Sequence, residues 1–208
     1  MDSLLLEYAL REAYEFAALA HAGQARKGSH APYITHPLAV MNVLVDLGVR
    51  DAVTLQAALL HDVVENSHRT MHEIRESFGP DVANVVAALV RPPDTRCDRA
   101  AFSHYLRHLS HRPRLIVLAD RIHNVNGLRA IVDDVAFVSA YLDETTDVFL
   151  SPWADDTDRT LAEMLRLALT RAERHALRDG TGLVSRISGN GAHGRGAPEF
   201  WRDAAGPS

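Results

Sequence analysis

An all-α fold is predicted by three observations on this sequence. Apolar residues recur at helical spacing in nearly every segment, and no segment shows the apolar/polar alternation of a half-buried strand. Capping residues and glycines divide this pattern into pieces of helical length. The chain of 208 residues is also long enough to bury one hydrophobic core. We therefore expect one helical bundle of roughly eight to ten helices over residues 1–179.

Two helices are predicted on either side of a polar loop near the N-terminus. From Leu4 to Ala20, apolar residues recur at helical spacing with charged residues between them. The loop that follows is GQARKGSHAPY. The next helix is expected to open at Pro37, because proline is tolerated in a first turn. It is expected to end at Gly48, since glycine is favoured just beyond a helix C-terminus.

Capping residues mark the helices that come next. Asp51 is expected to cap one continuous helix, AVTLQAALLHDVVEN. Thr70 and Glu73 form a capping-box pattern at the start of a short helix that ends near Gly79. The segment RPPDTR is expected to be a loop inside the domain. Further helices are expected at 81–90, 98–109, 112–130, 133–150 and 156–178.

The composition changes near Gly180. The segment GTGLVSRISGNGAHGRGAP is rich in glycine and poor in apolar residues. Residues 180–208 are therefore expected to form a flexible or loosely packed tail. The domain organisation predicted from the sequence is one domain over 1–179 followed by this tail.

Bulk composition limits the classes of function. The formal net charge is −5, so no general basic field would attract nucleic acid, although local basic residues can bind a small phosphorylated ligand. No apolar run approaches the roughly 18 residues of a membrane span. The N-terminal segment has the pattern of an amphipathic helix and not of a secretory signal. The single cysteine, Cys97, cannot form an intramolecular disulfide, and we therefore expect a cytoplasmic protein.

The dipeptide His61-Asp62 is the first candidate site. Histidine occurs 12 times, and composition predicts about one His-Asp pair by chance, so the context must decide. The pair follows the apolar stretch AALL, and a buried aspartate is costly unless a metal or another partner compensates it. Glu65 and Asn66 follow one turn later and place a carboxylate beside the pair to handle water. The alternative is a chance grouping on a helix.

Two further segments offer ligands. In LADRIHNVNGL, Asp120 shares a helix face with His123 and Asn124, and the alternative role for this aspartate is a salt bridge. In PYITHPLAV, His36 precedes Pro37 at a helix start, and the alternative is a capping or surface histidine. Two imidazoles and two carboxylates suit Mn²⁺, Fe²⁺ or Zn²⁺ better than Ca²⁺.

Taken together, AHAGQARKGSHAPYITHPLAV, AALLHDVVEN and LADRIHN resemble the hydrolase domain of the RelA/SpoT alarmone family, within the HD superfamily of phosphohydrolases. The resemblance covers about residues 14 to 130 and is closest to the stand-alone small alarmone hydrolases. It implies an all-helical HD domain that removes pyrophosphate from the 3′ position of guanosine tetra- or pentaphosphate. It also implies a divalent metal, with Mn²⁺ expected and Fe²⁺ or Zn²⁺ as alternatives.

The resemblance further implies roles for individual residues. The family's metal ligands are matched by His36, His61, Asp62 and Asp120. Glu65 matches a carboxylate that activates the nucleophile, and Asn66 occupies the neighbouring catalytic position. The candidate substrate-binding residues are Arg26, Lys27, Tyr33 and Asn124. Without the resemblance, the two basic residues would be interpreted as a solvated loop pair.

Several positions depart from the family pattern. The family's HDxxED is HDVVEN here, and Asn66 can form hydrogen bonds but cannot act as a general base near neutral pH. A family lysine before LAD is replaced by Val117, and an Arg-Thr pair is replaced by Asn126 and Gly127. The loop segment GSHA also differs from the family's SGEP-like form. The predicted metal ligands are thus retained while the residues expected to face the substrate differ.

Three hypotheses on function follow. The first is an alarmone-type 3′-pyrophosphohydrolase, which the whole motif series favours. The second is an HD phosphatase for another nucleotide or a phosphorylated nucleoside, in a specialised pathway, which Asn66 and the altered positions favour. The third is a non-catalytic nucleotide-binding or regulatory domain, and retention of the ligands and Glu65 argues against it.

Overall fold

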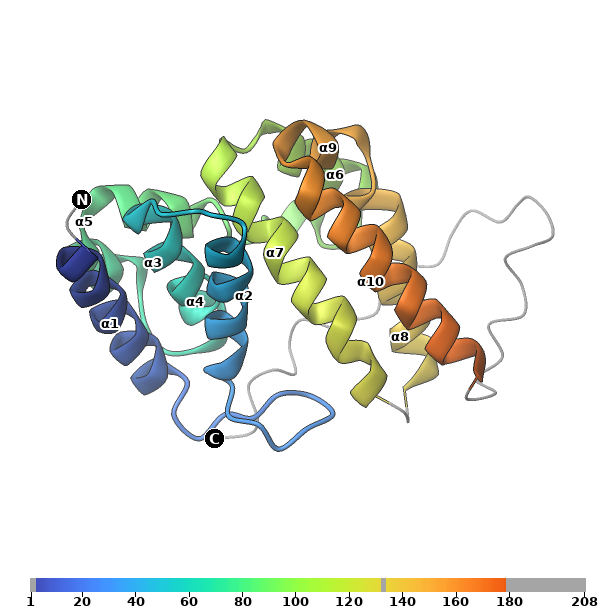
Figure 1. Ribbon diagram of the computed structural model, residues 1–208, viewed down its shortest axis with the longest axis horizontal. Helices are drawn as coiled ribbons and strands as arrows, with labels where there is room; N and C mark the ends of the chain where they lie inside the picture. Colours follow the sequence, from blue (N-terminus) through green and yellow to red (C-terminus); the bar gives the residue numbers. More distant parts are fainter. Residues whose placement is uncertain (1–2, 132–133, 179–208) are drawn as a thin grey trace.

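The computed structural model describes residues 3–131 and 134–178. Within these ranges the chain forms helices and no strand, and one isolated bridge pairs Ala25 with Pro32 in the loop after the first helix. The predicted all-α fold is therefore confirmed (Figure 1). The tail predicted at 180–208 lies outside the described residues.

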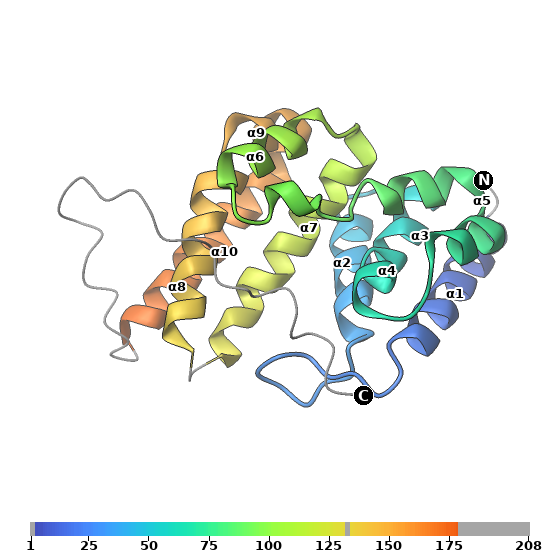
Figure 2. The ribbon, with the colours of Figure 1, turned by 180° about the vertical axis from the view of Figure 1, so that it is seen from behind.

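The helices form two groups with α7 between them (Figures 1 and 2). The first group is α1 (Ser3–Ala20), α2 (Thr35–Asp46), α3 (Ala52–Leu60), α4 (Val63–Asn66) and α5 (Met71–Ala87). The second group follows the turn η1 (Pro93–Thr95) and contains α6 (Arg99–His108), α8 (Val135–Glu144), α9 (Pro152–Thr157) and α10 (Arg159–Arg178). Helix α7 (His111–Gly127) contacts α2 and α3 on one side and α9 and α10 on the other.

The buried face of α7 explains its central place. Its fully buried residues include Ile116, Leu118 and Ala119. Helix α10 packs on this helix with Leu161 and Leu165, which are also fully buried. Burial of a leucine or isoleucine side chain contributes about 1.5–3 kcal/mol, so this contact between groups stabilises the region that carries the candidate site. None of the helices in the described ranges combines the length and apolar composition that a membrane crossing requires.

Three predicted helix ends in the N-terminal group are confirmed, whereas α2 begins at Thr35 and not at the predicted Pro37. Asp51 accepts a hydrogen bond from the Thr54 amide at the start of α3. Thr70 and Glu73 form both bonds of the capping box that opens α5. Gly79 has a φ of 80° and kinks α5, where the sequence predicted one helix to end and another to begin. These ends are local features, and residues three positions apart suffice to create them.

Two other predicted helices were wrong in extent. The segment from Ala52 to Asn66 was expected to be one helix, but it is broken at His61 and Asp62. The His61 ring donates to the Ala58 carbonyl oxygen, which in a continuous helix would accept from the amide of Asp62, so a side chain competes with the backbone here. The helix expected at 156–178 begins instead at 159, because Asp158 is extended and caps α10.

The C-terminal ends of two other predicted helices are distorted. Helix α7 continues into a tight turn, η2 (Leu128–Ala130), within the range that the sequence predicted as helix. Helix α8 continues into a π-helical turn, η3 (Thr145–Phe149). π-helical turns are rare and often lie at functional sites, since they change the direction of side chains within a helix.

Candidate active site

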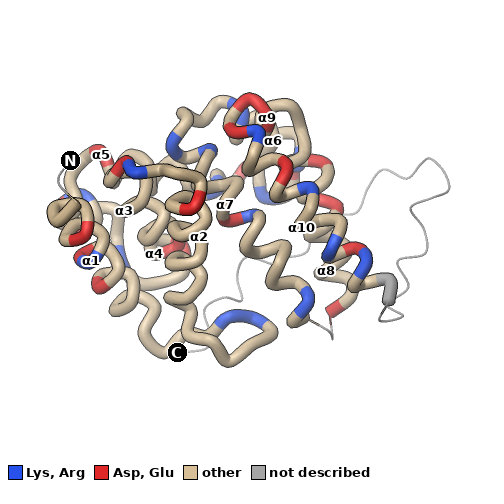
Figure 3. The backbone as a smooth tube through the Cα atoms, viewed as in Figure 1, with Lys and Arg blue, Asp and Glu red and all other residues tan. Residues whose placement is uncertain are grey.

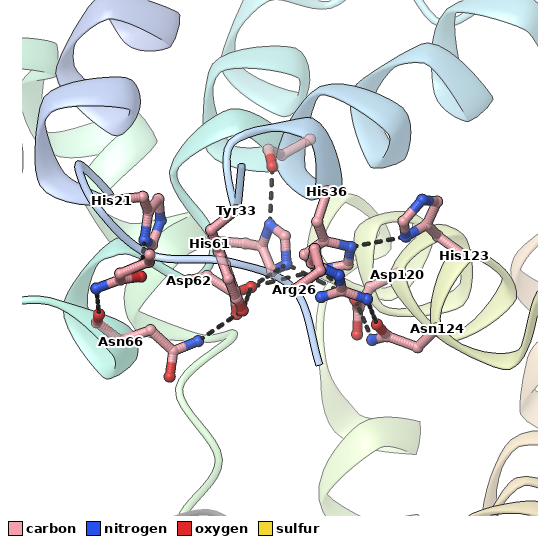
Figure 4. A network of polar contacts seen from close by, with 12 residues as sticks. His21, Arg26, Tyr33, His36, His61, Asp62, Asn66, Asp120, His123 and Asn124 are labelled. Atoms are coloured by element: carbon pink, nitrogen blue, oxygen red, sulfur yellow. Dashed lines mark hydrogen bonds and ion pairs between the residues drawn. The ribbon is translucent and has the colours of Figure 1, made fainter. Parts of the chain in front are cut away.

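Four side chains from three parts of the chain meet between α2, α7 and the break after α3 (Figure 4). His36 is the second residue of α2, and Asp120 lies within α7. His61 and Asp62 form the break itself. Both histidines are buried, with 1% and 7% of their surface exposed. The four residues predicted as metal ligands are thus brought together.

The donor atoms of these side chains converge. His36, His61 and Asp62 each offer one ligand atom, and these atoms lie within 4.8 Å of one another. Asp62 Oδ2 lies 3.4 Å from His36 Nε2 and 3.3 Å from His61 Nε2. Asp120 Oδ1 lies 3.0 and 3.7 Å from the same two nitrogens. Ligands about 2.1 Å from a tetrahedral ion are about 3.4 Å apart, so these spacings suit a metal.

The hydrogen bonds of the His61 imidazole indicate whether a cation fits between the four side chains. Its Nδ1 lies 2.9 Å from the Ala58 carbonyl oxygen, which can only accept, so Nδ1 carries the ring proton. The Nε2 atom of the neutral ring is then an acceptor, and it is buried without a hydrogen-bond partner among the described residues. It faces the carboxylates of Asp62 and Asp120, which are acceptors too. A divalent cation would satisfy all these lone pairs, and the mixed nitrogen and oxygen donors fit a transition metal.

The electrostatics of the cluster favour positive charge within it. Burial by itself raises the pKa of Asp62, but the neighbouring His61 and His36 more than offset this and hold the pKa well below its usual range. Burial lowers the pKa of His61, whereas Asp62 and Asp120 outweigh burial and raise it well above the ordinary value. The same two carboxylates would therefore stabilise either a proton on His61 or a bound metal.

His123 contacts the Nδ1 atom of His36, whereas the Nε2 atom of His36 faces the carboxylates. The two Nδ1 atoms lie 2.8 Å apart, so one ring donates to the other. Burial and the neighbouring His36 lower the pKa of His123 to about 4, which keeps its ring neutral and able to accept. His36 then donates from Nδ1 and leaves Nε2 free to bind a metal, an arrangement common behind metal-ligating histidines. His123 was not among the predicted site residues, although its spacing from Asp120 on α7 was the available signal.

Tyr33 links Asp62 to Asn66. Its hydroxyl donates to Asp62 Oδ2 at 2.7 Å and accepts from the Asn66 amide at 3.0 Å. Burial, followed by the charge of Asp62, raises the pKa of Tyr33, so the hydroxyl keeps its proton. Asn66 is therefore a hydrogen-bond donor next to the site, where a carboxylate could only accept.

Two residues that the sequence did not single out support this network. Gln24 donates to the backbone carbonyl of Asn66 at 2.6 Å and lies 2.9 Å from Nδ1 of His21. The His21 ring is 3% exposed and packs against Tyr33 with ring centroids 4.6 Å apart. His21 precedes the polar loop and Gln24 is its second residue, and the segment AHAGQARK that contains both belongs to the resemblance to the family.

Glu65 lies in α4, three residues after Asp62. Its Oε1 accepts a hydrogen bond of 3.3 Å from the backbone amide of Arg91. The side chain is exposed, but desolvation by the surrounding protein and the charge of Asp62 raise the pKa of Glu65. A carboxylate with a raised pKa is a stronger base near neutral pH.

Arg26 and Asn124 lie next to Asp120. The Arg26 guanidinium donates to Asn124 Oδ1 at 2.7 Å, and the Asn124 amide donates to Asp120 Oδ1 at 2.7 Å. The loop after α1 can lie this close to α7 because it has glycine at position 28. A Cβ at Gly28, whose φ is 75°, would stand 2.6 Å from the Ala130 carbonyl oxygen.

Lys27 has different neighbours from Arg26. Its amine lies 3.2 Å from Asp134 in an exposed ion pair and 4.2 Å from the centroid of the Phe137 ring. Figure 3 shows the basic residues of this loop beside the end of α7. The two basic residues predicted to bind substrate therefore have different surroundings. Arg26 belongs to the cluster around Asp120, and Lys27 extends toward α8.

Similarity to known proteins establishes the family. The model of the HD domain family matches residues 13–152. The chain belongs to the HD domain family. Its HD domain is 40% identical over 126 residues to a probable GTP pyrophosphokinase of Mycobacterium leprae. It is also 40% identical over 123 residues to a guanosine-3′,5′-bis(diphosphate) 3′-pyrophosphohydrolase of Xenopus tropicalis.

The alignments cover different shares of this chain and of its relatives. These two alignments cover 58% and 57% of this chain, but only 16% of the Mycobacterium leprae protein and 68% of the Xenopus protein. A solved structure described as a metazoan ortholog of SpoT that hydrolyzes ppGpp has a TM-score of 0.63 at 26% identity. The alignment covers 85% of this chain and 97% of the chain in that structure. The predicted HD fold and the resemblance to RelA/SpoT hydrolase domains are confirmed.

Proposed function

We propose that this HD domain is a divalent-metal-dependent phosphohydrolase that acts on a nucleotide. The observation that carries the proposal is the convergence of two imidazoles and two carboxylates on the unpaired Nε2 atom of His61. The residues that would hold the metal are His36, His61, Asp62 and Asp120. We expect Mn²⁺, with Fe²⁺ or Zn²⁺ as alternatives. When bound, such a metal acidifies water and offsets negative charge on phosphoryl oxygens.

The remaining residues supply a base and substrate contacts. Glu65 orients the attacking water and takes its proton, which its raised pKa favours. Arg26 offers a guanidinium to a phosphate, and its hydrogen bond to Asn124 aims it over α7. Asn124 and Tyr33 fix the ligands Asp120 and Asp62 and are the expected contacts of the nucleoside portion.

The first candidate substrate is a guanosine 3′-pyrophosphate, because the Xenopus relative is named as a hydrolase of this compound. Hydrolysis would break the bond between the ribose 3′ oxygen and phosphorus and release pyrophosphate. The alternative is a phosphomonoesterase for another nucleotide or phosphorylated nucleoside. Its supporting observation is that Asn66 donates to Tyr33, so this position contributes no second carboxylate.

A product assay separates these functions. The purified protein with Mn²⁺ is offered guanosine tetraphosphate and a panel of nucleoside monophosphates, and released pyrophosphate and phosphate are measured separately. Pyrophosphate from the tetraphosphate supports the first candidate, and phosphate from a monoester supports the second. Nucleotide binding without turnover of any substrate would leave a non-catalytic binding domain and contradict the proposal.

Asn66→Asp tests the position that separates the candidates. If a second carboxylate is needed for pyrophosphate release, the substitution should create this activity or raise it about 100-fold or more, the contribution typical of a general base. The control is Asn84→Asp, which adds the same charge at an exposed residue of α5 that bonds Arg75. Equal pyrophosphate release from both variants would show that position 66 does not decide the substrate.

We also infer a cytoplasmic location and a small-molecule partner. Cys97 is exposed and is a free thiol, which fits a reducing compartment. The net charge of −5 disfavours nucleic acid as the partner.

A further inference from the structure

Two buried arginines share one glutamate at the edge of the candidate site. Arg121 on α7 donates from Nη2 to Glu144 Oε1 at 2.8 Å. Arg91, which follows α5, donates from Nη1 to both carboxylate oxygens at 3.3 and 3.5 Å. The residues Arg91 and Arg121 are only 7% and 3% exposed. We call these three residues the arginine bridge.

Aromatic rings enclose the bridge. The Arg91 guanidinium lies 3.7 Å from the centroid of the Phe102 ring, and Arg121 lies 3.7 Å from that of Phe149. The two phenyl rings contact each other edge to face, with centroids 5.9 Å apart. Phe149 ends the π-helical turn that starts directly after Glu144. The unusual turn thus brings a ring against a guanidinium, and the bridge is held rigidly by cation–π contacts and ion pairs.

The bridge reaches both sides of the candidate site. Arg91 donates its backbone amide to Glu65, and its side chain is anchored by Glu144 and by the Thr95 carbonyl oxygen at 3.0 Å. Arg121 directly follows Asp120 on α7. Glu144 therefore connects the segment that contacts the proposed base to the helix that carries a proposed metal ligand.

We propose that Arg91 and Glu144 are positioning residues for the reaction, because the arginine bridge fixes the distance between Glu65 and Asp120. This inference rests on the proposed function. The bridge acts through the Arg91 amide, which bonds Glu65, and through α7, which carries Asp120. A displacement of about 1 Å in a reacting group can lower a rate about 100-fold.

Arg91→Met is the variant that separates positioning from stability. The Arg121–Glu144 pair remains, so the two opposite charges still offset each other, and methionine can pack against Phe102. Replacing part of a buried ionic triad by an apolar side chain is often neutral or stabilising. We expect an unchanged or higher Tm, a kcat lowered about 10- to 100-fold, and KM and Mn²⁺ affinity within about 3-fold of wild type.

Conservative and distant variants complete the test. Arg91→Lys keeps a cation near Glu144 and should recover part of the lost kcat. Asp155→Asn removes a partner of Arg166 between α9 and α10, where the two side chains lie 2.6 Å apart, and should leave kcat unchanged. Wild-type kcat in Arg91→Met would overturn the proposal, as would a loss of activity that only follows the fraction of unfolded protein.

A second measurement does not depend on the proposed function. Hydrogen exchange at the amide of residue 91 should be faster in Arg91→Met than in wild type, because the loop is no longer anchored to Glu144. An unchanged exchange rate contradicts the bridge even if the enzyme is active. If wild-type protein hydrolyses no nucleotide but the exchange rate rises, the proposed function fails while the anchoring by the bridge stands.

Discussion

The proposed metal cluster and the arginine bridge are both buried groups of charged side chains, yet they are built in opposite ways. In the metal cluster, the lone pair of His61 Nε2 faces the carboxylates of Asp62 and Asp120, so acceptors meet acceptors. In the bridge, two guanidiniums donate to the acceptor Glu144. Buried polar groups are stable only when they are paired. The first cluster therefore needs added positive charge, which a bound metal or a proton on His61 would supply, whereas the second contains its own cations.

The contrast shows how a buried cluster that binds a ligand can be distinguished from one that only supports the fold. Burial and charge are common to both clusters and identify neither function. The direction of the hydrogen bonds distinguishes them, because only the metal cluster presents unpaired lone pairs. The first two predictions below each change one cluster and leave the other intact, and the third compares two cations of the loop beside the metal cluster.

The largest effect is expected from His61→Ala. Loss of this ligand should abolish metal binding and lower hydrolysis at least about 1000-fold, since the metal activates water and offsets charge. Metal content is measured by elemental analysis. A second readout is thermal stabilisation, which for wild type should reach about 2.7 kcal/mol at a Mn²⁺ concentration 100 times the Kd.

His72→Ala is the matched control for His61→Ala. His72 lies on α5 with 76% of its side chain exposed and pairs with Glu76. This variant should keep the metal, the activity and the Mn²⁺-dependent stabilisation. A full complement of metal in His61→Ala would refute the proposed cluster.

The next effect concerns the bridge and pH. Burial raises the pKa of Glu144, but Arg121 and Arg91 outweigh burial and lower the pKa below its usual value of 4.5. The stabilisation by this carboxylate is thus present above pH 4.5 and is lost as pH falls through the lower pKa of the folded state. At pH 7, Glu144→Gln should cost about 3–5 kcal/mol, because it breaks a buried pair.

The difference in stability between wild type and Glu144→Gln should narrow below pH 4.5, since a protonated Glu144 resembles glutamine. Thermal unfolding across pH 3–7 measures this difference. A gap that stays constant over that range would mean that the charge of Glu144 does not stabilise the bridge.

The smallest effects separate the two loop cations. Arg26→Ala should raise KM about 10-fold, because it removes a charged hydrogen-bond donor beside Asp120. Lys27→Ala should change KM less than about 2-fold, since the lysine forms an exposed ion pair with Asp134 and such pairs contribute little. Steady-state kinetics on the substrate that the product assay identifies measures the KM of both variants. Equal changes in KM would show that Lys27 also contacts the substrate.

Local patterns predicted much of the fold. The caps at Asp51 and Thr70 and the kink at Gly79 depend on residues close in sequence, so they could be predicted. The break at His61 could not, because the ring that competes for the Ala58 carbonyl oxygen also belongs to a tertiary cluster. For the same reason, His123 and Gln24 were not predicted as parts of the site, since their partners come from other segments of the chain.

The sequence by itself determined the helical class and the main capping residues, because helical spacing and capping act within about four residues. It also offered four candidate ligands, of which His61 and Asp62 rest on local context and His36 and Asp120 mainly on the resemblance to the family. Only the tertiary structure decided which side chains meet. Arg26 and Asn124 are 98 positions apart, and Arg91 and Glu144 are 53 apart. Contacts over such separations depend on how α7 packs between the two helix groups, and no local pattern encodes that packing.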